Sequence, residues 1–552
     1  MSFIRPLMAA GAAAALLAAA PVVQAQEAPV VEAPAGAVRG ASQGDLEVFK
    51  GLPYAQPPVG AARWTPPRPA PRWEGVRDAS RFGPACFQPI PRAGSLYADP
   101  PAAMSEDCLS LNVWAPKGAA RLPVLVWIHG GALTGGASSE TVYDGSGLAE
   151  QGLVVVSINY RLGVLGYLAH PQLSAESPLG LSGNYGLLDQ IQALRWVRDN
   201  IAAFGGDPSN VTIAGESAGG LSVMYLMASP PARGLFAKAI AESAYMISTP
   251  ALKHAAYGAP SAEDSGLALA AGLHAAGIGD LRAMDARALT DQAGAAGFAP
   301  WGAVDGQVLT GQLVDVFDHG QQAPVPLLAG FNSGEIRSLT FLLPPAPSSP
   351  AQYEALIRAH YGDLADAFLS LYPSSDVHDS MLRTTRDALY GWTAQRLAIK
   401  QTALGQPAYL YLWDHGFPAA DDKGLHGFHA SEVPFVFGTL DLTPPYWPKA
   451  PDTDEARSFS HAMTAYWASF AKTGVPQAPG QPDWPAYGVG GRYMAFHDAP
   501  QPSEHLLPGM YELNEAVVCR RHAAGGQGWN WNVGVIAPRL PAKTAACAQP
   551  AP

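Results

Sequence analysis

Basic residues are scarce in this sequence. Only 14% of its residues are charged, and 34 lysines and arginines stand against 46 aspartates and glutamates, which gives a formal net charge of −12. Proteins that bind nucleic acid or an anionic membrane surface usually carry clustered positive charge. We therefore expect neither as a partner, although the net charge says little about a small substrate.

Long apolar runs are absent beyond the N-terminus. There, Arg5 precedes an Ala/Leu-rich stretch at 7–20, and Val23 and Ala25 supply small residues at both positions of a cleavage site. This pattern predicts a secretory signal peptide over residues 1–25, because the apolar stretch is short for a membrane anchor. We expect the mature chain, 26–552, to be exported to the periplasm or the medium without stable insertion into a membrane.

Cysteine is rare, with four residues in 552. An even number in an exported chain predicts two disulfides, for which three pairings are open. Pairing Cys86 with Cys108 and Cys519 with Cys547 joins the cysteines that are nearest in sequence, so it costs the least entropy. No cluster of His, Cys and Asp has metal-ligand spacing, and no glycine-rich turn has the context of a dinucleotide site. We expect no metal and no cofactor.

Linkers are missing as well, since about 527 mature residues contain no Gly/Ser-rich joint, no charge run and no internal repeat. Short apolar runs alternate with helical patterns from about residue 120 to 415, which indicates one large α/β domain around a mostly parallel sheet. Helix-rich stretches at about 248–323 and 339–406 should lie over the carboxyl ends of the strands, where ligands bind. The expected strands are 122–128, 153–158, 211–214, 237–241, 325–329 and 409–413, and the clearest helix is 186–204.

A serine lies at the centre of the motif Gly215-Glu216-Ser217-Ala218-Gly219. The pentapeptide alone is weak in a chain with 58 glycines, but a strand-like run precedes it and a helical run, 220–228, follows it. Glycines two residues on either side of a serine allow a strand to reverse sharply into a helix and leave the serine exposed at the tip. The pattern predicts a nucleophile at Ser217.

A second glycine-rich turn, His129-Gly130-Gly131-Ala132, follows the expected strand 122–128. In serine hydrolases of the α/β type, N–H groups of such a turn and the N–H after the nucleophile hold the substrate oxyanion. The expected donors are therefore Gly131, Ala132 and Ala218. An ordinary turn at a strand end is the alternative for this motif alone.

Serine needs a base to take its proton and an acid to orient that base. In serine hydrolases of the α/β type, the acid and then the histidine follow the serine in the sequence. Glu335, just past the strand 325–329, is the expected acid, and His429 is the expected base, with His426 as its competitor.

These motifs resemble the type-B carboxylesterases and cholinesterase-like α/β-hydrolases over about 37–511, nearly the whole mature chain. The resemblance implies the α/β-hydrolase fold, with helices on both faces of the sheet and large helical insertions over the active site. It makes Ser217 the nucleophile and Glu335 the acid, and the spacing to Val436-Phe437-Gly438 favours His429 over His426. It rests on ordered landmarks at 49–55, 57–60, 105–113, 129–132, 159–163, 183–190, 204–208 and 215–220.

The resemblance also implies the Cys86–Cys108 loop and a salt bridge between Arg63 and Glu106. The chain departs from the family where Gly334 and Ile336 flank the acid in place of aspartate and glycine, and where Ala132 replaces a third glycine. An additional C-terminal tail from about residue 520, with Trp and Asn at 529–532 and Cys547, has no counterpart in the family.

Four residues are candidates to line the substrate pocket: Glu216, Phe298, Trp301 and Phe435. A carboxylate beside the nucleophile could attract a cationic substrate group, but it more often shapes the site through a buried hydrogen-bond network. Aromatic residues at such places are as often plain core. Ser243 is expected behind the site at most.

The sequence as a whole predicts an exported serine ester hydrolase that acts on a small-molecule ester through an acyl-enzyme intermediate. Two alternatives stay open. A catalytically inactive relative could serve as a binding protein, although such proteins usually lose a triad member. An amidase or acyl transferase could use the same triad. The sequence makes no prediction of the oligomeric state.

Overall fold

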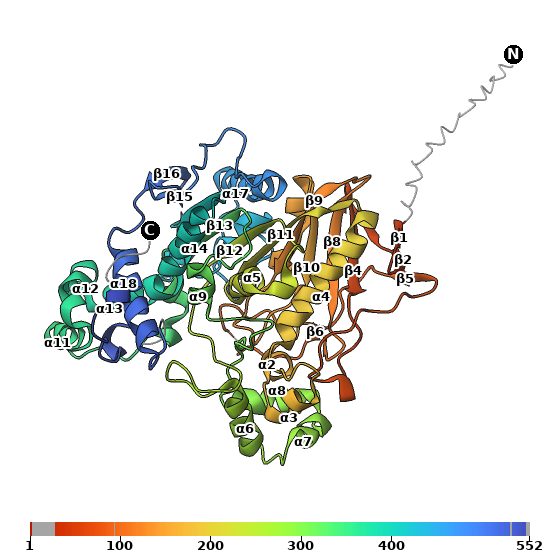
Figure 1. Cartoon of the computed structure of the whole chain (residues 1–552). Coiled ribbons are helices and arrows are strands. Elements are labelled where there is room, and N and C mark those ends of the chain that lie inside the picture. Colours follow the sequence, from red (N-terminus) through yellow and green to blue (C-terminus); the bar gives the residue numbers. More distant parts are fainter. Residues whose placement is uncertain (3–27, 93, 530–532, 548–552) are drawn as a thin grey trace.

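A computed structural model describes residues 1–2, 28–92, 94–529 and 533–547 (Figure 1). The predicted signal peptide at 1–25 and the tail residues 530–532 lie almost entirely outside this part of the chain, so those expectations stay predictions. Within the described residues, no helix combines the length and the apolar character that a membrane crossing requires.

The main sheet has eleven strands among the described residues, and its centre is parallel. Each neighbouring pair from β10 to β15 runs parallel, whereas the pairs at both margins are antiparallel. The expected mostly parallel sheet is confirmed. In spatial order the strands are β16 (Pro500–Glu504), β15 (Arg492–Phe496), β14 (Ala408–Trp413), β13 (Leu327–Asn332), β12 (Lys238–Glu242), β11 (Gly206–Glu216), β9 (Leu122–Ile128), β10 (Val154–Ile158), β8 (Ser110–Pro116), β4 (Leu46–Pro53) and β3 (Ala41–Gln43).

Alternate side chains of β9 enter two separate hydrophobic cores, because successive residues of a strand point to opposite faces. Val124, Val126 and Ile128 join the core beneath α4 (Tyr185–Asn200), α5 (Ala218–Ala228) and α14 (Trp392–Ala403). Leu125 and Trp127 join the core beneath α1 (Ser146–Glu150) and α17 (Asp454–Thr473). Helices therefore cover both faces of the sheet, as Figure 1 shows.

Two margins of the sheet were not expected from apolar runs. Strand β8 carries the buried polar residue Asn112, whose side chain bonds Ser138 and Ser157 at 3.1 and 3.0 Å. This polar residue breaks the continuous apolar pattern that marks the central strands. Antiparallel β15 and β16 follow turn-rich sequence and are partly exposed.

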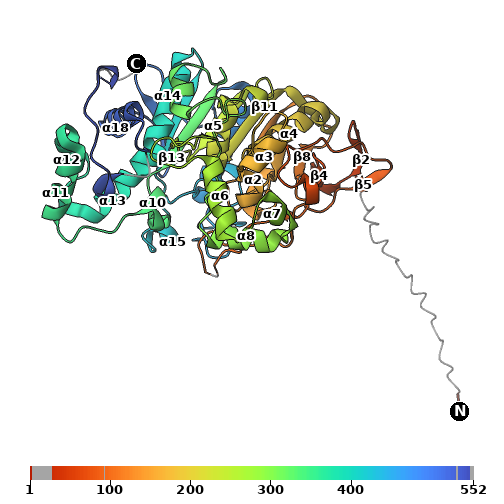
Figure 2. The same ribbon diagram turned by 60° about the horizontal axis from the view of Figure 1, so that its bottom comes forward.

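The helical insertions reach the carboxyl edge of the sheet at two places. In 248–323, α8 (Ala286–Ala295) packs on α2 (Gly163–Tyr167), which follows the end of β10. In 339–406, α13 (Val377–Arg386) packs on α10 (Glu335–Ser338), which follows β13, whereas α14 packs on β13 and β14. Figure 2 shows α6 (Ala262–Gly272), α7 (Ile278–Ala283) and α8 in front of the sheet. The second insertion therefore only partly lies over the carboxyl ends, since α14 covers a face.

The remaining elements lie around this framework. A small sheet pairs β1 (Val30–Ala33), β2 (Gly36–Arg39) and β5 (Val76–Asp78). In the C-terminal region, α18 (Met510–Ala524) packs on α14. The other helices include α3 (Pro171–Glu176), α9 (Leu313–Asp318), α11 (Pro350–Tyr361), α12 (Ala365–Leu371), α15 (Pro418–Asp421) and α16 (Val433–Phe437).

Candidate active site

Ser217 lies at the tip of a sharp turn between β11 and α5, with φ 57° and ψ −119°. Its N–H donates to the carbonyl of Glu242 at 3.0 Å. A Cβ on Gly219 would lie 2.0 Å from the carbonyl oxygen of Ile128, and one on Gly215 would lie 2.6 Å from the Gly219 carbonyl carbon. Both glycines are therefore required by close backbone approach, and the left-handed serine carries the strain of a nucleophile turn.

The turn after β9 lies directly against Ser217. A Cβ on Gly130 would be 3.2 Å from the Cβ of Ser217. Gly131 and Ala132 both have positive φ, at 100° and 56°, and both are exposed. Among the described residues, their N–H groups donate to no protein acceptor. Free N–H groups beside a nucleophile can stabilise an oxyanion, as the N–H of Ala218 at the start of α5 also can.

His129 supports this turn from below. Its ring is buried, stacks on Tyr160 with 4.5 Å between ring centroids, and its Nδ1 lies 2.9 Å from the carbonyl oxygen of Gly130. Burial lowers the pKa of His129 to about 4, although the bond to Gly130 acts in the opposite direction. The ring is therefore neutral at ordinary pH, and its Nδ1–H donates to the turn.

His429 and Glu335 form a buried pair. The Nδ1 of His429 contacts Oε2 of Glu335, whose other oxygen accepts from the hydroxyl of Ser243 at 2.7 Å and from the N–H of Asn332 at 2.9 Å. Glu335 is completely buried at the start of α10. Three bonds therefore fix the carboxylate, and the carboxylate in turn fixes the orientation of the imidazole.

The unusual residues beside the acid fit the space available to them. The N–H of Gly334 donates to the carbonyl of Gly427 at 2.8 Å, and a Cβ at Gly334 would lie 2.6 Å from the carbonyl oxygen of Leu425. Ile336 is buried in the core. The loop that carries the histidine thus approaches α10 closely because residue 334 lacks a side chain.

The second nitrogen of His429 faces a carboxylate. Its Nε2 lies 3.1 Å from Oε1 of Glu216, and the described residues show no hydrogen bond between His429 and Ser217. Burial lowers the pKa of His429, but Glu216 and Glu335 outweigh it and raise this pKa to about 9. Burial raises the pKa of Glu216 to about 7, against the attraction of His429. Glu216 and His429 are thus electrostatically linked, and Glu216 directly precedes Ser217 in the chain.

His426 lies in a different environment. Its side chain is 40% exposed, with Nδ1 2.9 Å from Asp421 and Nε2 3.1 Å from Asp414. Both ring nitrogens therefore have partners outside the site. The structure brings His429, and not His426, to Glu335.

The candidate pocket residues separate into two groups. Trp301 meets Tyr245 edge-on, Tyr245 meets Tyr390, and Tyr390 lies 5.3 Å from the ring of His429. Trp301 is therefore connected to the site through aromatic rings. The structure gives Phe298 and Phe435 other surroundings.

Phe298 is half-buried and packs against the core around α8. Phe435 is only 1% exposed and packs on Trp413 and Phe459, with ring centroids 5.0 and 5.8 Å away. The structure does not bring Phe435 to the site, because its side chain fills the core beneath α16 and α17.

Sequence reasoning did not single out four further groups near the site. The Oε1 of Glu242 accepts from the indole N–H of Trp467 at 2.8 Å, and Glu432 contacts the side-chain amide of Asn332. Burial raises the pKa of both carboxyls, that of Glu242 to about 8. Glu432 lies three residues after His429, so its motif offered a signal. Glu242, Tyr97 and Tyr390 carry no local pattern, because only tertiary folding brings them to the site.

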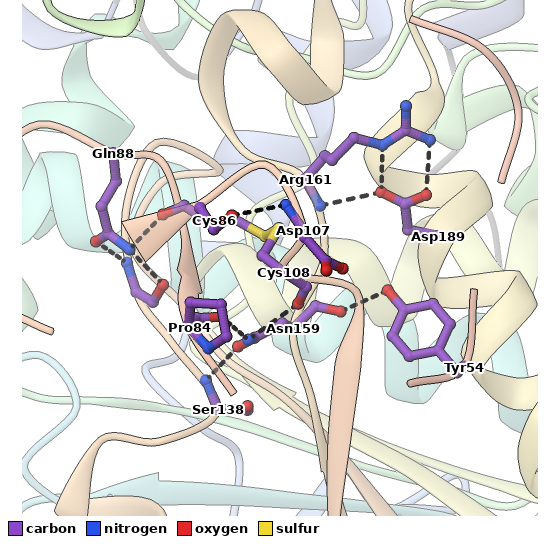
Figure 3. Close-up of a disulfide and its surroundings, with 12 residues drawn as sticks. Tyr54, Pro84, Cys86, Gln88, Asp107, Cys108, Ser138, Asn159, Arg161 and Asp189 are labelled. Atoms are coloured by element: carbon purple, nitrogen blue, oxygen red, sulfur yellow. Dashed lines mark hydrogen bonds and ion pairs between the residues drawn. A yellow bond between two sulfur atoms is a disulfide. The ribbon is translucent and has the colours of Figure 1, made fainter. Parts of the chain in front are cut away.

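The predicted crosslinks are present. The structure pairs Cys86 with Cys108 and Cys519 with Cys547. Figure 3 shows the first disulfide, beside which the Asn159 side chain donates to the Cys108 carbonyl at 3.2 Å. Arg63 binds Glu106 at 2.7 Å, also as expected.

Comparison with known proteins identifies the family of the chain. The carboxylesterase family model matches residues 27–509. The chain belongs to the carboxylesterase family. This carboxylesterase is 38% identical to fumonisin B1 esterase of Sphingopyxis macrogoltabida over 479 residues, which cover 84% of the chain and 85% of that protein. It is 39% identical to para-nitrobenzyl esterase of Bacillus subtilis (strain 168) over 462 residues, which cover 82% and 91%.

Solved structures give the same result. A PNB esterase structure superposes on the carboxylesterase with a TM-score of 0.76 at 35% identity, covering 88% of this chain and 99% of the other. A thermophilic PNB esterase superposes with a TM-score of 0.75. The α/β-hydrolase fold is confirmed, and the protein is a carboxylesterase that acts on small-molecule esters. In the part of the chain that the structure describes, no cluster of His, Cys, Asp and Glu could hold a metal ion.

Proposed function

We propose that this carboxylesterase uses a Ser217, His429 and Glu335 triad and forms an acyl-enzyme on Ser217. The observation that carries the proposal is the coincidence of a strained serine turn with a buried histidine already held by a carboxylate. Serine becomes a strong nucleophile only when a positioned base takes its proton.

The steps follow from these positions. Ser217 Oγ attacks the ester carbonyl carbon while Nε2 of His429 takes the hydroxyl proton, and Glu335 stabilises the imidazolium that forms. The N–H groups of Gly131, Ala132 and Ala218 hold the oxyanion. When the C–O bond breaks, His429 gives its proton to the leaving alcohol, and the alcohol departs. Water then attacks the acyl-enzyme with His429 again as base, which releases the acid and restores Ser217.

Glu216 fits this scheme as the resting partner of His429. In the free protein Nε2 lies 3.1 Å from Glu216, the residue that precedes the nucleophile in the chain. In the proposed reaction the imidazole exchanges that contact for one with Ser217 Oγ. Catalytic hydrogen bonds commonly tighten only when substrate binds.

The relatives support a substrate class, and the disulfides support a location. Two relatives are named fumonisin B1 esterase and para-nitrobenzyl esterase, which supports an organic ester as substrate here too. Two disulfides support export, because such bonds persist in oxidising compartments.

Hydrolysis of p-nitrophenyl esters, from acetate to a long acyl chain, tests the proposal. We expect turnover by the mature protein, loss of that turnover in Ser217→Ala, and none of this loss in Ser209→Ala, which changes an exposed serine at the other end of β11. The chain-length profile measures the acyl pocket. Retained turnover in Ser217→Ala would refute the triad, and a protein inert to every ester would favour a binding function.

A further inference from the structure

The disulfide between Cys86 and Cys108 closes a loop whose ends are joined a second time. Next to the disulfide, β6 (Ala85–Cys86) pairs with β7 (Met104–Ser105) in a short parallel ladder. We call the described residues 86–92 and 94–108 the disulfide loop. A doubly closed loop has little freedom at its base, so its contacts farther along can hold other groups in place.

Gln88 makes the first such contact, just past the disulfide. Its side-chain oxygen accepts from the N–H of Gly136 at 2.9 Å, and its side-chain nitrogen donates to the carbonyl of Gly136, also at 2.9 Å (Figure 3). Gly136 ends the segment 129–136, which begins with the turn at 129–132 that carries the proposed oxyanion donors, here called the oxyanion turn. A Cβ on Gly136 would lie 2.4 Å from Nδ1 of His129. Within this segment the N–H of Gly135 donates to Gly131 at 2.9 Å. Gln88 therefore binds both backbone groups of Gly136, four residues after Ala132.

Tyr97 makes the second contact, at the other half of the site. Its hydroxyl lies 2.9 Å from the main-chain carbonyl oxygen of His429 and 2.7 Å from the hydroxyl of Ser338. Because a carbonyl can only accept, the Tyr97 hydroxyl donates its proton to the His429 carbonyl. The phenol oxygen can then accept from the Ser338 hydroxyl. Ser338 ends α10, which begins with Glu335. Burial raises the pKa of Tyr97 well above its ordinary value, so the phenol keeps its proton as a donor.

We propose that the disulfide loop is a positioning element for catalysis, in which Gln88 holds the oxyanion turn and Tyr97 holds His429 against Glu335. The inference rests on the proposed triad. It gives the two halves of the active site a common support, fixed covalently at the disulfide, and it makes Gln88 and Tyr97 positioning residues that act through other groups. Small displacements of such groups cost catalysis far more than they cost binding.

Tyr97→Phe tests the histidine contact. We expect kcat to fall about tenfold with KM within about twofold. A less firmly held His429 is also stabilised less as a cation by Glu335 and Glu216, the charged groups that face it, so its pKa should fall. The rings of Tyr97 and Tyr390 remain in place. The acid limb of kcat/KM should therefore move to lower pH. Tyr353→Phe is the matched control, since its hydroxyl also donates to a main-chain carbonyl, that of Tyr372 at 3.0 Å, in α11. A uniform fall at every pH, or wild-type kcat, would overturn this half of the proposal.

Gln88→Leu tests the other contact. We expect about a tenfold loss of kcat and a matching loss of affinity for a trifluoromethyl ketone, whose adduct with Ser217 places an oxyanion at the turn. Rates are normalised to active sites titrated with a fluorophosphonate, so loss of folded protein does not count. Unchanged ketone affinity in Gln88→Leu would overturn the inference for Gln88.

The disulfide itself provides the joint test. In the double variant Cys86→Ser/Cys108→Ser, kcat per titrated site should fall by at least as much as in either single variant. The double variant Cys519→Ser/Cys547→Ser removes a crosslink of similar span, 28 against 22 residues, and should keep kcat. Equal kcat in both double variants would contradict the inference, and if the first double variant does not fold, Tyr97→Phe and Gln88→Leu still decide. Turnover is measured alongside in the wild type and in Ser217→Ala. If only the wild type is active, Ser217 is still required for turnover, and a negative result with the loop variants contradicts the loop proposal alone.

Discussion

In one half of the active site two turns meet through close backbone approach at glycines, whereas in the other half two side chains from distant loops meet through hydrogen bonds. The serine and oxyanion turns meet through glycines 130, 215 and 219, where any Cβ would collide with backbone or with Ser217. Glu335 and His429 meet through side-chain bonds across 94 residues of sequence. The first half is therefore intolerant of added atoms, and the second is intolerant of lost hydrogen bonds.

Glu335→Gln should break the second half with the largest effect. An amide at this position can donate to Nδ1 and so stabilise the wrong tautomer of His429, which should lower kcat by about a thousandfold with the fold intact. Glu515→Gln is the control, because Glu515 binds Arg396 and Trp392 away from the site and should affect stability but not kcat. Wild-type turnover in Glu335→Gln would remove Glu335 from the triad.

Gly219→Ala should break the first half. Its Cβ would lie 2.0 Å from the Ile128 carbonyl oxygen, and such overpacking costs about 1–3 kcal/mol and displaces the turn. We expect kcat to fall by about a hundredfold, since a misplacement of about 1 Å has that effect. Gly272→Ala in α6, where the Cβ would meet nothing within 4 Å, should be neutral or stabilising by about 0.5–1 kcal/mol. Full activity in Gly219→Ala, measured with thermal unfolding, would show that the backbone can yield.

The same contrast explains which features the sequence could predict. The sharp turns at 129–132 and 215–219 were predictable because their geometry demands glycine at fixed places in short motifs. Central strands such as β9 were predictable because burial on both faces requires continuous apolar residues. Tyr97, which bonds the His429 carbonyl, and Glu242, whose carbonyl accepts from the N–H of Ser217, were not predictable, since they reach the site only through tertiary contacts. For Phe435, aromatic character alone could not separate a pocket from a core, and packing on Trp413 resolves its position.

Glu216→Gln would sharpen the comparison, because Glu216 belongs to the serine turn but acts on the histidine. His429 can act as a base only when it is neutral. Its pKa, raised to about 9, therefore restricts its action as a base to alkaline pH. Removing one of the two carboxylates that raise this pKa should move the acid limb of kcat/KM to lower pH. A pH series of initial rates measures this shift. An unmoved limb would mean that Glu216 does not control the ionisation of His429.

Ala132→Gly should have the smallest effect. Ala132 adopts φ 56°, a left-handed conformation that costs an alanine about 1–2 kcal/mol and costs glycine little. Glycine should relieve this strain, but it also makes the unfolded chain more flexible, so the net gain in unfolding free energy should stay under about 1 kcal/mol. The N–H of residue 132 is retained, so kcat should stay within about twofold. Because the proposed oxyanion donor at this position is a backbone N–H, a large loss of kcat in Ala132→Gly would show that the alanine methyl group itself contributes to the site.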